Sequence, residues 1–367
     1  MGDGPIARAT KIGELEFLRK IQRLLNEGDF SATYKFALLN ALADLSVERQ
    51  PAADDTLVLP LSAIAEKFIE FYWPQARPFD AVRGDATILQ QNTGRQAAVI
   101  TALVEQHAKH STLSVARRSN EWPALVNRVS RIIRVMPLWK LQTVGSEIDE
   151  FLYRRADFRN DKIQLRSGVA GAFRSLHGIV LDAVRGAWMR QIACIGVNRR
   201  MLGDADLATF LFGSERRSLA PFARVLRDHQ KGICHYCQRT IAGPGVVDHF
   251  VAWSRYPVDL GHNLVLSHAG CNGSKRDFLA HPRHLESWHA SNMERSGELV
   301  ERLNEGKLPH DFNRTVAIAW WAYQQGELAG AHAWIRGTTF ERLDATWRDA
   351  LQGTGIRHAA EIAAPDY

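Results

Sequence analysis

The sequence predicts a mainly helical protein that carries a small α+β metal-binding unit, and three observations support this fold class. Apolar residues recur at helical spacing over much of residues 11–195. Three of the four cysteines fall in one stretch, Lys231 to Asp277, which also contains two short apolar runs typical of strands. Helical patterns return after this stretch. We expect an α-rich N-terminal domain over 1–222, a metal-binding domain over 223–290 and a helical C-terminal extension over 291–367.

Periodic apolar segments and their stop signals predict the elements of the N-terminal domain. Leucines recur at helical spacing from Leu15 to Leu25, and Gly28 is typical of a helix end. The apolar run from Leu57 to Leu59 predicts a short strand, or an extended entry to the helix that follows. The later helices are expected at residues 34–47, 61–72, 95–106 and 169–195.

Arginine is concentrated in the middle of the chain. Residues 154–200 contain ten Lys and Arg against three Asp, and five arginines between 115 and 134 face one acidic residue, Glu121. Guanidinium groups match phosphate oxygens, so this excess suits a nucleic-acid-binding surface; a solvated helix face explains it equally well. We expect Arg174 and Arg185 beside the apolar stripe of the helix over 169–195, and Cys194 as a small buried side chain.

Composition and charge limit the class of protein. The chain has 367 residues, a net charge of +6 and 46% hydrophobic residues, which is ordinary for a globular protein with a modest basic excess. This excess permits a nucleic-acid partner without requiring one. Four cysteines argue against a disulfide framework and for a reducing compartment. The start of the chain lacks an apolar signal segment and no stretch suits a membrane span, so we expect a cytoplasmic protein with no membrane partner.

Two cysteine-containing pairs predict a zinc site. Cys234 and Cys237 form a C-x2-C pair, and His268 and Cys271 form an H-x2-C pair. Two side chains three positions apart on a tight turn converge on one ion, and two such turns supply the four ligands of a tetrahedral structural Zn2+. His235 lies inside the first pair, but it would have to displace a better-placed thiolate.

A predicted hairpin lies between the two pairs. A glycine-proline-glycine turn at 243–245 leads into the strand-like run 246–251, and a second short apolar run follows at 263–266. Asp248 and His249 are neighbours, so on an extended strand they would point to opposite faces, and a bend is needed to bring both to one site. Residues 272–277 are expected to open a helix that continues through Phe278.

This order of motifs resembles the HNH endonuclease family, whose active site is a ββα-metal unit. The resemblance covers a small part of the chain, around residues 231–277. Two positions depart from the family pattern: His268 stands where many relatives have cysteine, and Asn272 stands for the final histidine of the family name. Both residues remain competent as ligands. The residues that carry the resemblance are Cys234, Cys237, Asp248, His249, Asn263, Leu264, His268, Cys271, Asn272 and Lys275.

The chemistry of phosphodiester hydrolysis gives these residues their expected roles. A neutral imidazole is suited to take a proton from water near pH 7, so His249 is the expected general base. Asp248 and Asn272 would hold a catalytic divalent ion, Mg2+ or Mn2+. The resemblance implies that Asn263 orients the hairpin, and Lys275 is expected to contact phosphate near a helix N-terminus. The structural alternative for the Asp-His pair is a hydrogen bond at a strand end.

The resemblance therefore implies a metal-dependent endonuclease that hydrolyses DNA, in a setting such as bacterial anti-phage defence or restriction. A monomer should nick one strand, and an oligomer could cut both. The main alternative is a zinc-stabilised nucleic-acid-binding module without cleavage activity. A third hypothesis gives the N-terminal domain a protein partner from a defence system, or a small-molecule signal, that makes the nuclease conditional.

The C-terminal extension is expected to be helical and to supply packing residues. Its tryptophans are spaced as core residues rather than as a base-stacking surface, and the histidines that follow the motif lack ligand spacing. The expected helices cover residues 278–290, 298–304 and 314–325, and the residues beyond Gly355 are expected to fray.

Overall fold

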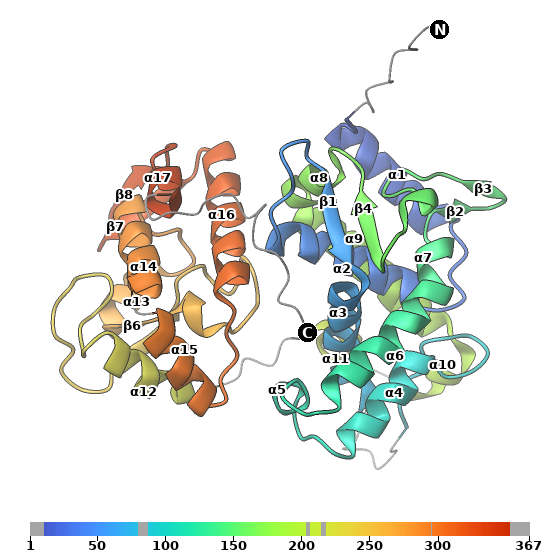
Figure 1. Ribbon diagram of the computed structural model, residues 1–367, viewed down its shortest axis with the longest axis horizontal. Coiled ribbons are helices and arrows are strands. Elements are labelled where there is room, and N and C mark those ends of the chain that lie inside the picture. Colours follow the sequence, from blue (N-terminus) through green and yellow to red (C-terminus); the bar gives the residue numbers. More distant parts are fainter. Residues whose placement is uncertain (1–10, 80–86, 203–205, 214–217, 295, 353–367) are drawn as a thin grey trace, which may run out of the picture. The chain divides into compact units, whose positions relative to one another are not determined.

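The computed structural model describes residues 11–79, 87–202, 206–213, 218–294 and 296–352, and the chain divides into two compact units (Figure 1). The N-terminal unit is Met1–Glu215 and the C-terminal unit is Arg216–Tyr367. Both are mainly α, and the sheets in the described residues are two-stranded and antiparallel. No helix in the described part of the chain is long and apolar enough to cross a bilayer. The fraying expected beyond Gly355 falls outside the described residues.

The N-terminal unit consists of helices with two small sheets, β1–β4 and β2–β3. Its elements in chain order are α1 (Glu14–Glu27), α2 (Tyr34–Glu48), β1 (Leu57–Pro60), α3 (Leu61–Tyr72), η1 (Pro74–Ala76), α4 (Ala98–His107), α5 (Leu113–Ala116), α6 (Trp122–Val135), α7 (Pro137–Lys140), β2 (Thr143–Val144), β3 (Glu147–Ile148), η3 (Arg155–Asp157), β4 (Lys162–Leu165), α8 (Val169–Ser175), α9 (His177–Cys194), α10 (Gly196–Leu202) and α11 (Leu207–Phe212).

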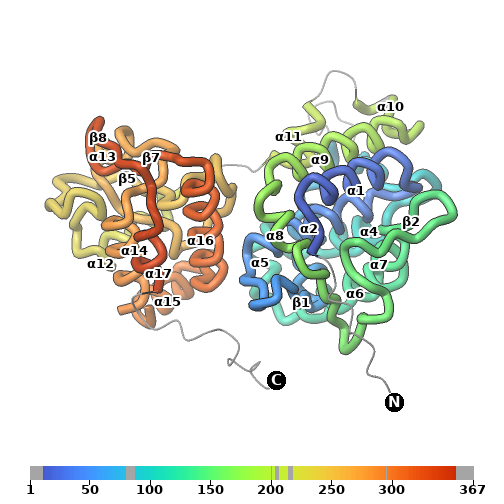
Figure 2. The backbone as a smooth tube through the Cα atoms, turned by 90° about the horizontal axis from the view of Figure 1, so that it is seen from above, coloured from blue at the N-terminus to red at the C-terminus, as the bar shows by residue number. Residues whose placement is uncertain are grey.

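Helix α2 is the centre of this unit. It packs against α3, α7, α8 and α9. In the view of Figure 2 it lies near the middle of the N-terminal unit. Its residues from Lys35 onward are buried on every face, which is expected of a helix without a polar side. The expected helices at 34–47 and 61–72 are confirmed. Both segments are rich in apolar residues, and each is followed by a proline, Pro51 or Pro74, that cannot continue a helix.

A buried ion network joins α2 to α3. The Lys67 ammonium lies 2.5 Å from Glu48 and 3.4 Å from Asp44, and the His177 ring bonds the other oxygen of Asp44 at 3.1 Å. Burial opposes ionisation of Asp44, but the charge of Lys67 and the hydrogen bond with His177 hold the pKa of its carboxyl well below the usual range. The two carboxylates therefore depend on Lys67 for compensation inside the core.

Replacing Lys67 with alanine should destabilise the N-terminal unit by about 3–5 kcal/mol, the usual cost of leaving a buried charge without its partner. Urea unfolding followed by tryptophan fluorescence measures this loss. The matched control is Lys109→Ala, which breaks the exposed pair with Glu121 and should leave the unfolding midpoint nearly unchanged. Equal midpoints for the two variants would contradict the assigned role of Lys67.

The long helix expected over 169–195 is two helices. Leu176 leaves helical geometry, with φ −107° and ψ 17°, and separates α8 from α9. The expectation of a buried Cys194 is also wrong, because this residue lies in the last turn of α9 and is exposed. Apolar periodicity does not reveal a break at a single residue, because both helices keep their apolar faces toward α2.

Several of the arginines in the middle of the chain have partners within the unit. Arg117 pairs with Glu70 at 3.3 Å, and Arg128 pairs with Glu105 at 2.5 Å. Arg174 was expected beside the apolar stripe, but it is buried and donates to the Ser46 carbonyl at 3.1 Å, and burial lowers the pKa of its guanidinium to about 10. These arginines therefore do not form one continuous open phosphate-binding face.

The described residues of both expected segments, 223–290 and 291–367, belong to the C-terminal unit. Residue 222 lies in helix α12 (Ala220–His229), and residue 290 lies in helix α14 (Pro282–Glu294). The elements of this unit are α12 (Ala220–His229), β5 (Val246–His249), η4 (Gly261–Asn263), β6 (Leu264–Ser267), α13 (Ala269–Lys275), α14 (Pro282–Glu294), α15 (Ser296–Glu305), α16 (Phe312–Leu328), β7 (His332–Arg336), β8 (Thr339–Arg342) and α17 (Trp347–Gln352).

Tryptophans form the core of this unit, as their spacing predicts. Trp288, Trp334 and Trp347 are fully buried, and Phe250 stacks on Trp288 with ring centroids 4.9 Å apart. This stack fixes the chain immediately after β5 against helix α14. The unit is therefore large enough to hold the β5–β6 hairpin with its own apolar core.

The helix expected to open at Asn272 and continue through Phe278 is wrong in both bounds. Helix α13 begins at Ala269 and ends at Lys275, because Arg276 adopts a positive φ of 49°. The next helix, α14, begins only at Pro282. The helix therefore begins three residues before the expected start, directly after His268. Asn272 lies inside the helix rather than at its first position.

His262 is a buried imidazole in this unit with no hydrogen-bond partner for either ring nitrogen among the described residues. It packs against the rings of His310 and Phe312. Burial, with a smaller effect of His310, lowers the pKa of His262 to about 4, whereas an unfolded histidine titrates near 6.5.

The C-terminal unit should consequently lose stability as the pH falls from about 6.5 to about 4. In this window the unfolded chain binds a proton that the folded His262 does not, so acid favours unfolding by up to about 3 kcal/mol. In His262→Phe, which keeps a ring but cannot titrate, the free energy of unfolding should vary less between pH 7 and pH 5. An unchanged pH dependence in urea titrations would contradict this.

Candidate metal centre and pocket of the C-terminal unit

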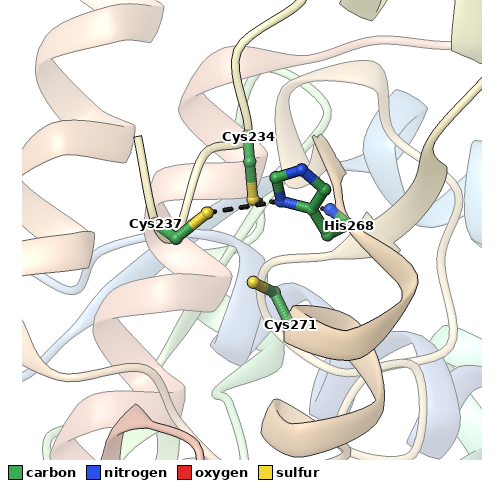
Figure 3. A group of neighbouring side chains, drawn as sticks. All are labelled: Cys234, Cys237, His268 and Cys271. Atoms are coloured by element: carbon green, nitrogen blue, oxygen red, sulfur yellow. Dashed lines mark hydrogen bonds between the residues drawn. The ribbon is translucent and has the colours of Figure 1, made fainter. Parts of the chain in front are cut away.

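Two turns bring four metal-binding side chains together (Figure 3). Cys234, Cys237, His268 and Cys271 place their ligand atoms within 4.8 Å of one another, and the picture shows the four side chains converging. The first turn closes through the Gln238 amide, which donates to the Cys234 carbonyl at 3.0 Å. The second turn is the start of α13, where His268 is the N-cap residue.

The electrostatics of this group favour a cation at its centre. Burial opposes ionisation of Cys234, but backbone N–H groups, including those of Cys237 and His268, lower its pKa to about 7. Burial and the neighbouring thiols raise the pKa of Cys271 to about 12. Three thiolates at this spacing repel one another unless a positive ion lies between them, so the donor set is consistent with a structural zinc ion.

The histidine ligand is oriented by the first turn. The Nε2 of His268 lies 3.2 Å from the Thr240 carbonyl, and its Nδ1 lies 3.3 Å from the Cys237 sulfur. A proton on Nε2 donated to Thr240 leaves Nδ1 as the ligand atom. His235 lies outside the group, as expected: it is buried, its Nε2 contacts the His284 carbonyl, and burial lowers its pKa to about 3.

A pocket of about 290 Å³ opens beside the hairpin. In register, Asp248 pairs with Val265 and His249 with Leu264, and the chain bends directly after His249. This bend explains how two neighbouring residues of one strand reach the same pocket. The pocket lining includes Asp248, His249, Trp253, Asp259, Asn272 and Arg276.

Asp248 is held on one side by two buried groups. Tyr236 donates its hydroxyl to Oδ2 at 2.6 Å, and the Lys275 ammonium lies 3.1 Å from the same oxygen. The second oxygen, Oδ1, has no protein partner in the described residues. Burial raises the pKa of Tyr236 well above its usual value, so this residue is a neutral donor at physiological pH.

Lys275 does not lie where a phosphate contact was expected. It is the last residue of α13 rather than a residue near a helix N-terminus, and it is 0% exposed. Its ammonium donates to the His249 carbonyl at 3.0 Å in addition to its ion pair with Asp248. Burial lowers its pKa, while Asp248 opposes that shift. Lys275 therefore contacts both Asp248 and His249 from the interior of the unit, and it does not line the pocket.

His249 has an acidic partner, Asp259, that the motif did not indicate. Its Nε2 lies 2.8 Å from Oδ1 of Asp259, and its ring packs against Trp253. A proton on Nε2 shared with Asp259 leaves the Nδ1 lone pair free to accept. The sequence offers one indication of this partner. Asp259 is the single acidic residue in the loop between β5 and β6, and it lies ten positions after His249.

Asn263 ties the two sides of the hairpin together. Its side chain accepts from the Val251 amide at 2.9 Å and donates to the Val251 carbonyl at 3.0 Å. It is buried and does not line the pocket. This contact holds the bend that follows His249.

These features define a mainly α protein with a Cys3His group in its C-terminal unit. The family model described as "Domain of unknown function (DUF8808)" matches residues 13–204, more than half of the chain, and the protein belongs to this family. None of the curated proteins or solved structures compared with the chain matches it. The matched segment lies in the N-terminal unit, so the metal group and the pocket are outside it.

Proposed function

We propose that the C-terminal unit is an HNH-type nuclease domain that hydrolyses DNA phosphodiester bonds. The observation that carries this proposal is the meeting of Asp248, His249 and Asn272 at one pocket beside a hairpin and a helix. Strands β5 and β6 and helix α13 then correspond to the ββα unit, and the Cys3His group holds that unit with a structural zinc ion.

His249 acts as the general base in this proposal. With Nε2 engaged by Asp259, Nδ1 takes a proton from a water molecule that attacks the phosphorus. The bond from phosphorus to the 3′ oxygen breaks, and that oxygen leaves with a proton from solvent. Asp259 is a positioning residue, because it selects the tautomer and the orientation of the ring.

A catalytic divalent ion fits the oxygens that remain free. Asp248 Oδ1 and the Asn272 amide oxygen have no protein partner in the described part of the chain, and both residues line the pocket. Mg2+ or Mn2+ bound there would stabilise the charge that develops on the phosphate and the leaving oxygen. Arg276, in the same lining, is available to a phosphate of the substrate.

The test uses purified full-length protein and supercoiled plasmids that differ in methylation, incubated with Mg2+, Mn2+ or Ni2+. The proposal expects conversion to nicked circles, or to linear DNA if two copies act together, only when a divalent ion is present. Cleavage confined to methylated or unmethylated plasmid would indicate a role in restriction. Absence of cleavage with every ion and plasmid would contradict a DNA nuclease.

A second candidate is a zinc-stabilised nucleic-acid-binding module without cleavage activity. One observation favours it: the Lys275 ammonium already compensates the Asp248 carboxylate, which weakens its attraction for a metal ion. Gel-shift measurements separate the two candidates. DNA binding that is independent of divalent ions, with no cleavage product, would support the module.

A further inference from the structure

The N-terminal unit contains a second pocket, of about 490 Å³, that the proposed nuclease chemistry does not use. It lies between the start of α3, one face of α6 and the turn that precedes β4. Arginine is the only basic residue type in its lining, and the polar residues there include Ser62, Asn127, Ser130, Arg131, Arg134 and Asp161.

Two side chains in this pocket lack partners in the part of the chain that the structure describes, and a third has one buried nitrogen without a partner. Ser130 is 9% exposed and lines the pocket, and its hydroxyl makes no hydrogen bond with the described residues. The Arg131 guanidinium has no carboxylate partner, in contrast to Arg128, one turn earlier on α6, which pairs with Glu105. The buried Nε of Arg134 is also without a partner, while another nitrogen of its guanidinium binds Asp161.

The start of α3 adds a third contribution. This helix has 12 residues and no side-chain cap, and its first amide, that of Leu61, donates to the Asp161 carbonyl at 2.7 Å. The next two amides, of Ser62 and Ala63, have no acceptor within the helix by its geometry. The positive end of the helix dipole thus reaches the pocket that contains Arg131 and Arg134.

We propose that this pocket binds the phosphate group of a small phosphorylated molecule. Two guanidinium groups, the hydroxyl of Ser130 and a helix N-terminus together complement a dianion. The volume falls in the range of about 300–1,000 Å³ that is typical of small-molecule sites. Asp161 is the one acidic group in the lining, and it competes with the ligand for Arg134.

The experiment is isothermal titration calorimetry of the full-length protein with pyrophosphate and with ATP, and with adenosine as a phosphate-free control. The phosphate compounds should bind and adenosine should not. Arg131→Gln should weaken binding about ten-fold or more, the loss expected for one hydrogen bond to a charged group. Arg128→Gln is the matched control, because it removes the same charge from the same helix outside the pocket, and it should leave the affinity unchanged.

Asp161→Asn provides a test in the opposite direction. Asparagine tolerates the positive φ of 56° at this position, so the turn should be kept. Removal of the competing carboxylate should tighten binding several-fold, which a purely structural role of Asp161 would not produce. The proposal would be overturned if neither pyrophosphate nor ATP binds at millimolar concentration. Equal weakening of binding by Arg128→Gln and Arg131→Gln would also overturn it. A third such result is a protein that binds DNA oligonucleotides but binds neither pyrophosphate nor ATP.

Discussion

Replacing His249 with alanine should reduce plasmid cleavage by about 10²- to 10⁴-fold, the usual contribution of a positioned general base. The ring is mostly buried at the pocket, with 14% of its side chain exposed, and it contacts Asp259 and Trp253 rather than the apolar core. Its removal should therefore leave the fold and the zinc content intact. The measurement is the initial rate of nicking with saturating Mg2+, together with zinc analysis of the same sample.

The matched control is His281→Ala. His281 is a partly exposed histidine of the same unit that pairs with Glu341 and lies outside the pocket lining. Its loss should leave the nicking rate unchanged. Full activity of His249→Ala would remove His249 from the chemistry, even if the protein cuts DNA.

Asp259→Asn separates a positioning role from binding. An amide in place of the carboxylate can still contact the ring, but it no longer selects the tautomer that leaves Nδ1 free. The expected result is a lower kcat with little change in KM, and partial rescue by Asp259→Glu. A change in KM alone would indicate that Asp259 contacts substrate instead.

Loss of the zinc ligands should have the largest effect on stability. Zinc binding contributes about 10–16 kcal/mol of apparent folding free energy in zinc-finger peptides, and this unit also has a tryptophan core, so we expect Cys271→Ser to cost on the order of 5 kcal/mol. Elemental analysis should find one zinc per chain in the parent protein and none in the variant.

Cys194→Ser is the control for this experiment. Cys194 is an exposed cysteine of the N-terminal unit, and its loss should change neither zinc content nor melting. A zinc-free parent protein with an unchanged melting curve after chelation would contradict the assignment of the Cys3His group.

The metal group could be predicted from the sequence because each ligand pair lies within four consecutive residues. Local chain geometry alone brings Cys234 toward Cys237 and His268 toward Cys271, so spacing is sufficient evidence. The helices α2 and α3 were predictable for a similar reason, since apolar periodicity and proline stops act within a few residues.

The contacts that define the pocket could not be predicted in the same way. Tyr236 and Lys275 reach Asp248 from different elements, and Asp259 reaches His249 across a loop. The prediction of a helix from Asn272 through Phe278 was wrong. Helix α13 begins at Ala269, and the positive φ of Arg276 ends it at Lys275. Lys275 consequently lies at a buried helix end.

By itself, the sequence determined the mainly α class, the four metal-binding side chains and the hairpin between them, because these depend on short-range spacing and local backbone preference. Only the tertiary structure decided which arginines are neutralised, which carboxylate orients His249, and that Lys275 is enclosed. Those outcomes depend on which distant side chains meet in a packed interior, where burial and pairing set the free energy of each charge.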